Sequence, residues 1–240
     1  MFDAKSLYPP RTKMKTPFYA PFSPFRSKLA PIVEVWQKYP DVIAQYKLDG
    51  NRNVIHVTPD RKITMWNRGD GQHTPEIQKY AVPDTMREEI LAISPEGHYT
   101  VWDTELMHFK TTGIKNTLYF YDVLVWHSEQ LLGKTYAERY KILQQEVACF
   151  KGCGDEGRYL VPDADYLNKS ASEGKHIWLA MSEKSDRWED AWNFAKGKPW
   201  IEGLVLKQTG YLSKLQPGTQ EINNNGFMCR VRKPKKNYLS

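Results

Sequence analysis

The chain has 240 residues, with 34 Lys and Arg against 28 Asp and Glu and a net charge of +6 at neutral pH. Its 40% hydrophobic and 13% aromatic content excludes an intrinsically disordered chain. The basic balance favours a polyanionic partner. No apolar run approaches the roughly 18 residues needed to cross a bilayer, and residues 1–10 lack the apolar core of a secretion signal. We therefore expect an intracellular protein with no membrane partner.

The chain begins with a proline-rich stretch without hydrophobic periodicity, which predicts an extended N-terminal arm over residues 1–30 and a folded domain over residues 31–240. Short β-branched or aromatic runs predict strands, and longer amphipathic runs predict helices. In chain order the predicted elements are a helix at 32–38, strands at 42–48, 53–58 and 62–66, a helix at 84–93 with Asp84 as N-cap, strands at 99–107 and 117–126, helices at 136–148 and 187–196, and strands at 200–207 and 227–232. This order predicts an α+β fold of antiparallel β-sheets flanked by helices.

The cysteines do not form a metal-binding pattern. Cys149 and Cys153 lie four residues apart, and Cys229 is distant. Structural zinc sites use four ligands, usually as two close pairs. We therefore expect buried or idle thiols rather than a zinc site.

The sharpest local pattern is Lys-Leu-Asp-Gly-Asn-Arg at residues 47–52. A lysine ends a predicted strand, an Asp-Gly turn follows, and an arginine begins the next strand. A hairpin turn explains Asp49 and Gly50. It does not explain the flanking Lys47 and Arg52, so a hairpin turn and a catalytic motif both remain open from this segment alone.

Further short patterns follow in a fixed order: Trp-Asn-Arg-Gly at 66–69, Asp-Thr-Glu at 103–105, Phe-Tyr-Asp at 120–122, Glu-Gly-Leu-Val-Leu-Lys at 202–207 and Arg-Val-Arg-Lys at 230–233. Together with residues 47–52, this order resembles the covalent nucleotidyltransferases, which include ATP-dependent DNA ligases, RNA ligases and messenger-RNA capping enzymes. Residues 47–52 match their K-x-D-G-x-R motif, and residues 202–207 match the ligase motif E-G-L/V-V-x-K. The resemblance implies the ATP-grasp-like nucleotidyltransferase domain of these enzymes.

The resemblance implies that Lys47 attacks the α-phosphate of ATP to form a lysyl-AMP intermediate with release of pyrophosphate. An attacking amine must be neutral, and a free lysine has a pKa of about 10.4. Desolvation and neighbouring cations lower the pKa of such an amine. Arg52, Arg230, Arg232 and a bound Mg²⁺ or Mn²⁺ are the expected sources of positive charge.

The same resemblance assigns further catalytic residues. It implies that Glu105 contacts the ribose, that Glu202 lies on the metal side with Asp49 as a tentative second ligand, and that Lys207 contacts the α-phosphate. Carboxylates of this kind suit Mg²⁺ or hydroxyl groups.

Other residues complete the expected nucleotide and nucleic-acid contacts. Tyr121 stands where the family has an aromatic residue that stacks on the base. Gln45 lies two residues before Lys47 on the same strand face, so its amide is expected to reach the base edge. The remaining residues expected to contact the nucleotide are Leu48, Arg52, Arg68, Arg230 and Arg232, and those expected to contact nucleic-acid phosphates are Arg68, Lys233 and Lys235.

The sequence departs from the family in three places. Arg230 and Arg232 stand where lysines are usual, which keeps the charge but changes its shape. Thr104 stands where glycine is common. The chain ends soon after Arg232, so we expect no OB-fold domain, and slower self-adenylylation and weaker substrate binding than in a two-domain relative.

The leading functional hypothesis is an ATP-dependent DNA ligase that seals nicked duplex DNA as a monomer. An RNA ligase is the alternative, with RNA or a hybrid as substrate, and a GTP-dependent capping enzyme is the less favoured one. The complete set of lysine and carboxylates argues against a non-catalytic nucleic-acid-binding module.

Overall fold

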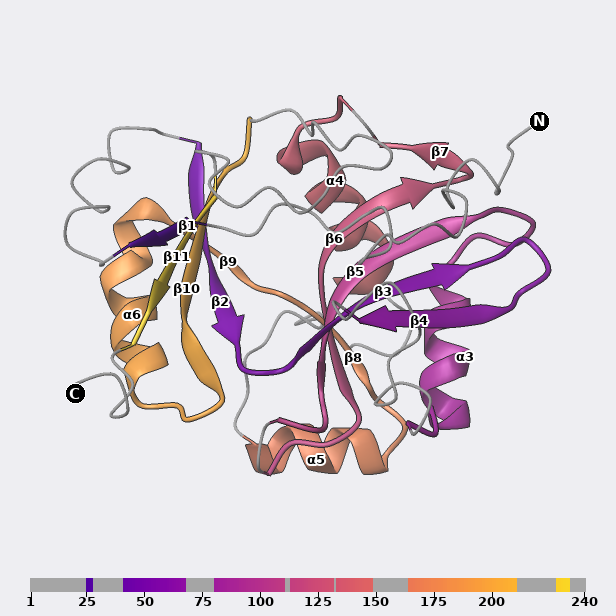
Figure 1. Cartoon of the computed structure of the whole chain (residues 1–240), viewed down its shortest axis with the longest axis horizontal. Helices are drawn as coiled ribbons and strands as arrows, with labels where there is room; N and C mark the ends of the chain where they lie inside the picture. The colour runs from indigo at the N-terminus through magenta and orange to yellow at the C-terminus, as the bar shows by residue number, and fades with distance from the viewer. Residues whose placement is uncertain are drawn as a thin grey trace, which may run out of the picture.

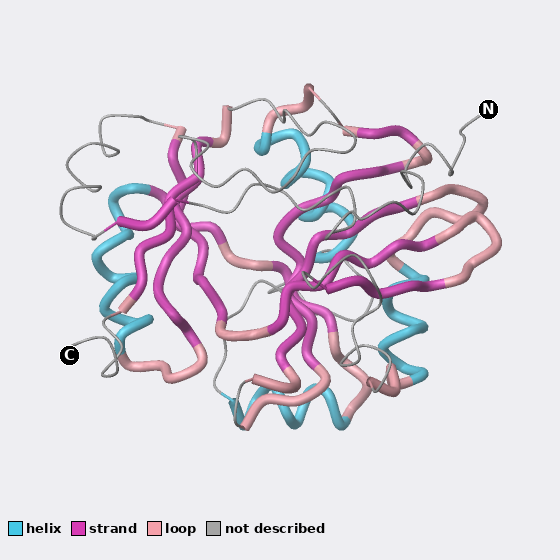
Figure 2. The backbone as a smooth tube through the Cα atoms, in the orientation of Figure 1, coloured by secondary structure: helices cyan, strands magenta, loops and turns pink. Residues whose placement is uncertain are grey.

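The computed structural model describes residues 25–27, 41–67, 80–110, 113–131, 133–148, 164–210 and 228–233. The strands form two sheets (Figures 1 and 2). The first sheet has the order β1-β11-β10-β2-β9, formed by β1 (Phe25–Ser27), β11 (Met228–Arg232), β10 (Ile201–Gln208), β2 (Val42–Leu48) and β9 (Ser182–Lys184). The second has the order β4-β3-β5-β6-β7, formed by β4 (Ile63–Asn67), β3 (Asn51–Val57), β5 (Thr100–Met107), β6 (Thr117–Trp126) and β7 (Glu129–Gln130), with β8 (Ile177–Leu179) also on β6.

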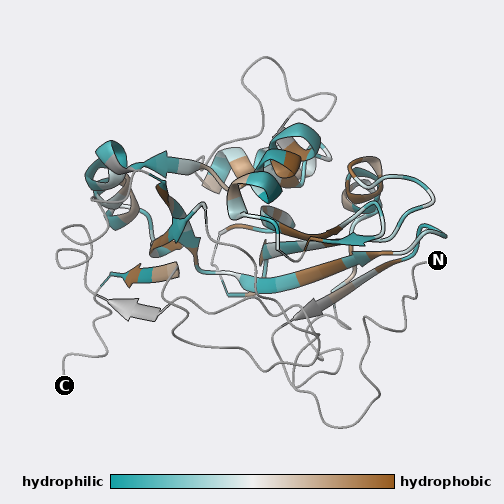
Figure 3. Cartoon of the chain, turned by 90° about the horizontal axis from the view of Figure 1, so that it is seen from above, coloured by the Kyte–Doolittle hydropathy of each residue, from teal (hydrophilic) through white to brown (hydrophobic). Residues whose placement is uncertain are grey.

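The helices cover the outer faces of these sheets. They are α3 (Asp84–Ala92), α4 (Tyr136–Leu143), α5 (Ala164–Ser172) and α6 (Trp188–Lys196), with a π-helix at Gln144–Ala148 and a 3₁₀ turn at Ser185–Arg187. Trp188 and Ala191 of α6 pack with Val42, Ala44 and Leu206 of the first sheet. A larger core joins the second sheet to α3 and α4. Hydrophobic residues of the strands are interspersed with hydrophilic ones (Figure 3), as expected for sheets with one face packed on helices.

This architecture confirms the predicted α+β fold of antiparallel sheets flanked by helices. The parallel exceptions are β1 with β11 and β6 with β8. Among the described residues, no helix is long and apolar enough to cross a membrane. The predicted helix at 32–38, the arm boundary at residue 30, and Cys149 and Cys153 lie outside the described residues.

Two details of the predicted elements were wrong. Asp84 is the first helical residue of α3, and Pro83 occupies the N-cap position without a side-chain cap. The Asp84 carboxylate still lies in the first turn, where the helix dipole favours negative charge. The helix predicted at 136–148 is α-helical only to Leu143 and then widens into a π-helix. Thr135 begins it with a capping box to Glu138.

The Asp49-Gly50 turn is not a hairpin. β2 and β3 belong to different sheets, so the chain crosses from the first sheet to the second at this turn (Figure 1). A Cβ atom on Gly50 would lie 2.7 Å from the carbonyl oxygen of Leu106 on β5. The glycine is therefore needed for close passage between sheets, and Lys47 and Arg52 come to lie on different sheets.

The chain crosses back between β8 and β9. The amide of Ala180 donates to the carbonyl of Phe120 on β6 at 2.9 Å, and Ser182 then pairs with Gln45 on β2. The two crossings bring residues of both sheets to one region of the molecule, where most residues of the quoted motifs meet.

A second glycine explains how the motif strands pack. Gly203 of β10 pairs with Lys47 on β2 and with Arg232 on β11. Gly203 stands at a register shift and has a φ of +150°. A Cβ atom added there would lie 1.9 Å from the carbonyl oxygen of Val231.

We expect Gly203→Ala to lower the free energy of unfolding by more than about 3 kcal/mol, because the added methyl group collides with backbone that cannot move alone. Gly197→Ala is the matched control. Gly197 has φ −78°, and its added Cβ would meet Phe194 O at an ordinary 3.6 Å, so we expect a change below about 1 kcal/mol. Urea titration followed by tryptophan fluorescence measures both, and equal losses would contradict the prediction.

Candidate active site

Two cations of the motifs converge on one carboxylate oxygen of Glu202. The Lys47 Nζ lies 2.6 Å from Oε2 of Glu202, and Nη2 of Arg232 lies 3.0 Å from the same oxygen. Gly203, which pairs with both Lys47 and Arg232 across the sheet, carries no side chain that could separate them. The side chain of Lys47 is 20% exposed, and the side chain of Glu202 is 8% exposed. The lysine is thus reachable from solvent, and its partner is held within the protein.

The charge around Glu202 is strongly shaped by its neighbours. Burial opposes ionisation, but Lys47, a hydrogen bond with Asp49 and the charge of Arg232 together lower the pKa of Glu202 to about 2. The backbone of Asp49 is fixed because its amide donates to the carbonyl of Trp200 at 2.8 Å. Asp49 and Glu202, which were predicted to share a metal ion, therefore lie together.

Across the crossing, Arg52 forms a buried ion pair with Asp103. Its Nε and Nη2 donate to the two carboxylate oxygens at 2.9 and 2.5 Å. Burial raises the pKa of Asp103, and the charge of Arg52 opposes the shift only in part. The bidentate geometry fixes the guanidinium plane. Arg52 was predicted as a cation for Lys47 and the nucleotide, and the structure shows that it also holds Asp103.

Tyr121 lies beside two cations. A register shift between β5 and β6 leaves it as an extra residue between Asp122 and Phe120, which pair with Asp103 and Thr104. Its ring centroid is 5.9 Å from Cζ of Arg52 and 5.4 Å from Nζ of Lys207. Burial and a hydrogen bond with Asp103 raise its pKa well above the usual value. The ring is therefore anchored at its hydroxyl, which suits the predicted base contact.

Lys207 is buried beside the Tyr121 ring. Its Nζ lies 4.3 Å from the ring centroid of Tyr136 on α4. Burial lowers the pKa of Lys207 to about 8, although Asp122 and Asp103 oppose the shift. An amine placed among aromatic rings and carboxylates keeps a charge that can be directed at a phosphate.

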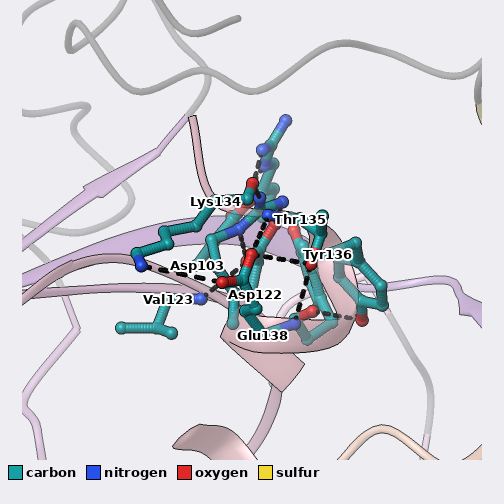
Figure 4. A network of polar contacts seen from close by, with 10 residues as sticks. Asp103, Asp122, Val123, Lys134, Thr135, Tyr136 and Glu138 are labelled. Atoms are coloured by element: carbon teal, nitrogen blue, oxygen red, sulfur yellow. Dashed lines mark hydrogen bonds and ion pairs between the residues drawn. The ribbon is translucent and has the colours of Figure 1, made fainter. Parts of the chain in front are cut away.

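Asp122 is neutralised by a residue that no motif indicated. Arg139 of α4 donates to its two carboxylate oxygens at 2.7 and 2.9 Å and to the carbonyl of Lys134 at 2.8 Å. Figure 4 shows Asp122 beside Asp103 and facing Thr135, Tyr136 and Glu138 at the start of α4. Asp103 and Asp122 lie inside the quoted motifs but received no predicted role. Tyr136 and Arg139 carry no sequence signal, because only the packing of α4 on β6 brings them to the site.

Glu105 sits on β5 opposite Arg52 and Tyr119. Burial raises its pKa to about 7, against the opposing charges of Lys47, Lys110 and Arg52. Near neutral pH this side chain exists as both acid and carboxylate. It can therefore donate to one hydroxyl group or accept from another, which suits the predicted ribose contact.

Leu48 and Lys233, also predicted as contact residues, have side chains held by other parts of the protein. The Leu48 side chain is in the core with Met107 and Trp200, so only its backbone can face a ligand. Lys233 Nζ donates to the carbonyls of Ala195 and Lys198 at 3.0 and 2.7 Å, at the end of α6. Its phosphate contact stays a prediction, as do the nucleotide contacts of Leu48 and of Arg230, which pairs with Val205 on β10. Arg68 and Lys235 lie outside the described residues.

The carboxylates fit a metal that arrives with a nucleotide. Among the described residues, no group of three or more His, Cys, Asp or Glu forms a complete ion site. Asp49 and Glu202 are hydrogen-bonded to each other. Mg²⁺ commonly keeps several waters and binds through one or two carboxylates and substrate phosphates. Asp49 and Glu202 have the number and chemistry for that role.

Comparison with solved structures identifies the fold. A mycobacterial DNA ligase D complexed with ATP matches with a TM-score of 0.52 over 89% of this chain, at 13% identity. The chain has the fold of a ligase adenylation domain. The ATP-dependent DNA ligase from bacteriophage T7, also in complex with ATP, matches with a TM-score of 0.50 over 82% of the chain, at 12% identity. The chain spans 60% and 65% of those two structures. No protein-family model and no curated protein sequence matches it.

Within this ligase fold, the two perturbed glutamates predict opposite pH dependences of stability. Glu202 titrates near 2 in the folded protein against an ordinary 4.5, so its stabilisation is present above about 4.5 and is lost as the pH falls towards 2. Glu105 titrates near 7, so its stabilisation is present below about 4.5 and is lost as the pH rises through 7.

We expect Glu202→Gln to flatten the acid side of the stability profile and Glu105→Gln to flatten the fall between pH 4.5 and 7. Urea midpoints from pH 3 to 8 for the wild type and both variants measure this, and each variant is the control for the other. A Glu105→Gln profile that keeps the wild-type slope above pH 4.5 would contradict the assignment.

Proposed function

We propose that the chain is the catalytic domain of an ATP-dependent polynucleotide ligase, with Lys47 as the nucleophile. The observation that carries the proposal is the contact of Lys47 Nζ with Glu202 at 2.6 Å, beside Arg232. It places a solvent-reachable lysine at the crossing of two sheets in a ligase adenylation fold. The two similar structures named above both contain ATP, which supports ATP as the nucleotide.

In the first step, the Lys47 amine attacks the α-phosphate of ATP, a phosphorus–nitrogen bond forms, and pyrophosphate leaves. Such phosphoryl transfer depends mainly on positioning and charge stabilisation. Arg232 and Lys207 supply positive charge for the phosphates. Glu105 bonds the ribose hydroxyl groups, and the ring of Tyr121 supports the base.

The Lys47 proton must leave before the amine can attack. Glu202 is the nearest carboxylate at 2.6 Å. The charge of Lys47 helps to lower the pKa of Glu202, so the carboxylate is ionised and orients the amine. The proton passes to water, which reaches the 20% exposed lysine side chain.

Asp49 and Glu202 would hold Mg²⁺ or Mn²⁺ that accompanies the triphosphate. When bound, the ion supplies charge neutralisation for the phosphates and the leaving pyrophosphate. Arg232 shares Glu202 with Lys47 in the free protein, so it keeps the carboxylate neutralised when the lysine turns to the nucleotide.

In the later steps, the adenylate passes to a 5′-phosphate, and a 3′-hydroxyl displaces AMP to join the strands. Both similar structures named above are DNA ligases, which supports nicked duplex DNA as the first substrate to test. RNA ligation is the alternative, and GTP-dependent capping is the less favoured one. We propose a monomer that acts inside the cell.

Covalent labelling tests the first step. We expect wild-type protein with Mg²⁺ and ATP labelled on the α-phosphate to acquire a label that survives denaturation, and Lys47→Ala and Lys47→Arg to acquire none. Lys141→Ala is the matched control, because Lys141 is exposed on α4, and it should label normally. Intact mass first shows whether AMP is already bound, and treatment with pyrophosphate removes it before labelling. Labelling of Lys47→Ala at the wild-type rate would contradict the proposal.

Strand joining tests the second step. We expect pre-adenylylated protein to seal a nicked DNA duplex with a 5′-phosphate and to leave the matching duplex without that phosphate untouched. Nicked RNA and hybrid duplexes run in parallel, with denaturing gels as the readout. Faster sealing of RNA would replace DNA by RNA as the substrate while leaving the adenylylation step intact.

A further inference from the structure

Lys207 is a buried cation that has no carboxylate of its own. Its side chain is almost fully buried, and no ion pair of the described residues includes it. Its Nζ lies instead 4.3 Å from the ring centroid of Tyr136 and 5.4 Å from that of Tyr121. Buried charges are normally paired. An ammonium left against two aromatic rings is therefore available to an anionic ligand.

The carboxylates that act on Lys207 are held by arginines. These carboxylates belong to Asp103 and Asp122. Arg52 donates two hydrogen bonds to the first, and Arg139 donates two to the second. A planar guanidinium matches a carboxylate with two parallel hydrogen bonds, which an ammonium cannot do. Three cations thus share two carboxylates in this group, and the surplus positive charge rests on Lys207.

The pair of Arg139 with Asp122 is fixed from several sides. Arg139 is buried and also donates to the carbonyl of Lys134 at 2.8 Å. Its Cζ lies 5.5 Å from the ring centroid of Tyr136. Oδ1 of Asp122 accepts a further hydrogen bond, at 2.8 Å, from the main-chain amide of the next residue. Asp122 therefore has little capacity left for another donor.

Tyr136 links this pair to the nucleotide side of the site. Its ring contacts both Arg139 and Lys207. Its hydroxyl donates to the carbonyl of Tyr121 at 2.8 Å and hydrogen-bonds the side chain of Gln45. Arg139 thus acts on the predicted contact residues through Asp122 and Tyr136.

We infer that Arg139 is a positioning residue that occupies Asp122 and so leaves the ammonium of Lys207 free for a phosphate. The inference rests on the proposed function, in which Lys207 contacts the α-phosphate, and it adds a residue outside the quoted motifs. Without Arg139, Asp122 would be a buried carboxylate that has lost its partner. The ammonium of Lys207 would then pair with Asp122, and the phosphate would lose that contact.

The rate of lysyl-AMP formation from ATP, followed by intact mass spectrometry, tests the inference. We expect Arg139→Met to react about a hundred-fold more slowly than the wild type, because a charge directed at the reacting phosphate is withdrawn. Combining Arg139→Met with Asp122→Asn removes the cation and the carboxylate together. We expect this double variant to recover to within about ten-fold of the wild type.

Two further variants complete the set. Arg139→Lys keeps a cation but leaves one oxygen of Asp122 without its donor, so we expect a smaller loss in the same direction. It takes the place of Arg139→Met if that variant does not fold. Arg87→Met, at an exposed position on α3, is the matched control and should react at the wild-type rate.

The protonation of Lys207 gives a readout that does not depend on catalysis. Burial lowers the pKa of Lys207 to about 8; Asp122 and Asp103 oppose this shift, and Arg139 and Arg52 add to it. Arg139→Met should raise this pKa, and the double variant should return it towards the wild-type value. NMR of protein with lysine labelled with ¹³C at Cε measures the titration, and the signal lost in Lys207→Arg identifies the residue.

A double variant as slow as Arg139→Met would overturn the inference, because the arginine would then act through packing alone. An unchanged pKa of Lys207 in Arg139→Met would also overturn it, and either result would leave the proposed function standing. Failure of the wild type to form an adduct with ATP would instead overturn the proposed function. The NMR titration would still decide whether Arg139 controls the charge of Lys207.

Discussion

The chain crossing at Asp49-Gly50 is the constraint on which the site depends. Because β2 and β3 lie in different sheets, six consecutive residues place a lysine on one sheet and an arginine on the other. The crossing is tight enough that a side chain on Gly50 would collide with β5. A hairpin with the same sequence would leave both side chains on one sheet edge, without Glu202 and Asp103 to receive them.

The site is otherwise an arrangement of neutralised charges. Lys47 and Arg232 share Glu202, Arg52 holds Asp103, and Arg139 holds Asp122. Ions removed from water are tolerated only when they are paired in good geometry. Glu105 has no such partner among the described residues, and burial raises its pKa to about 7, which suits the predicted ribose contact. A triphosphate would then meet a polar surface that is already oriented.

Local sequence signals predicted most of the long elements, but they missed the nine-residue helix α5 (Ala164–Ser172) and the short strands. The strand at 117–126 has the predicted bounds, because seven of its ten residues are β-branched or aromatic and it lies between clear turns. β8 and β9 each have three residues, which is too short for a period to appear. The π-helix after Leu143 keeps the composition of an α-helix, so only the packing around it reveals the change.

The sequence by itself determined the fold class and the order of the motif residues, because hydrophobic periodicity and residue identity are local properties of the chain. It did not determine that Lys47 and Arg52 would face different partners, or that Arg139, Tyr136 and Ser182 would belong to the site. Those residues lie on other elements, and only the two crossings and the docking of α4 bring them within hydrogen-bond distance. Partners far apart in sequence leave no local pattern, so the tertiary structure alone decided them.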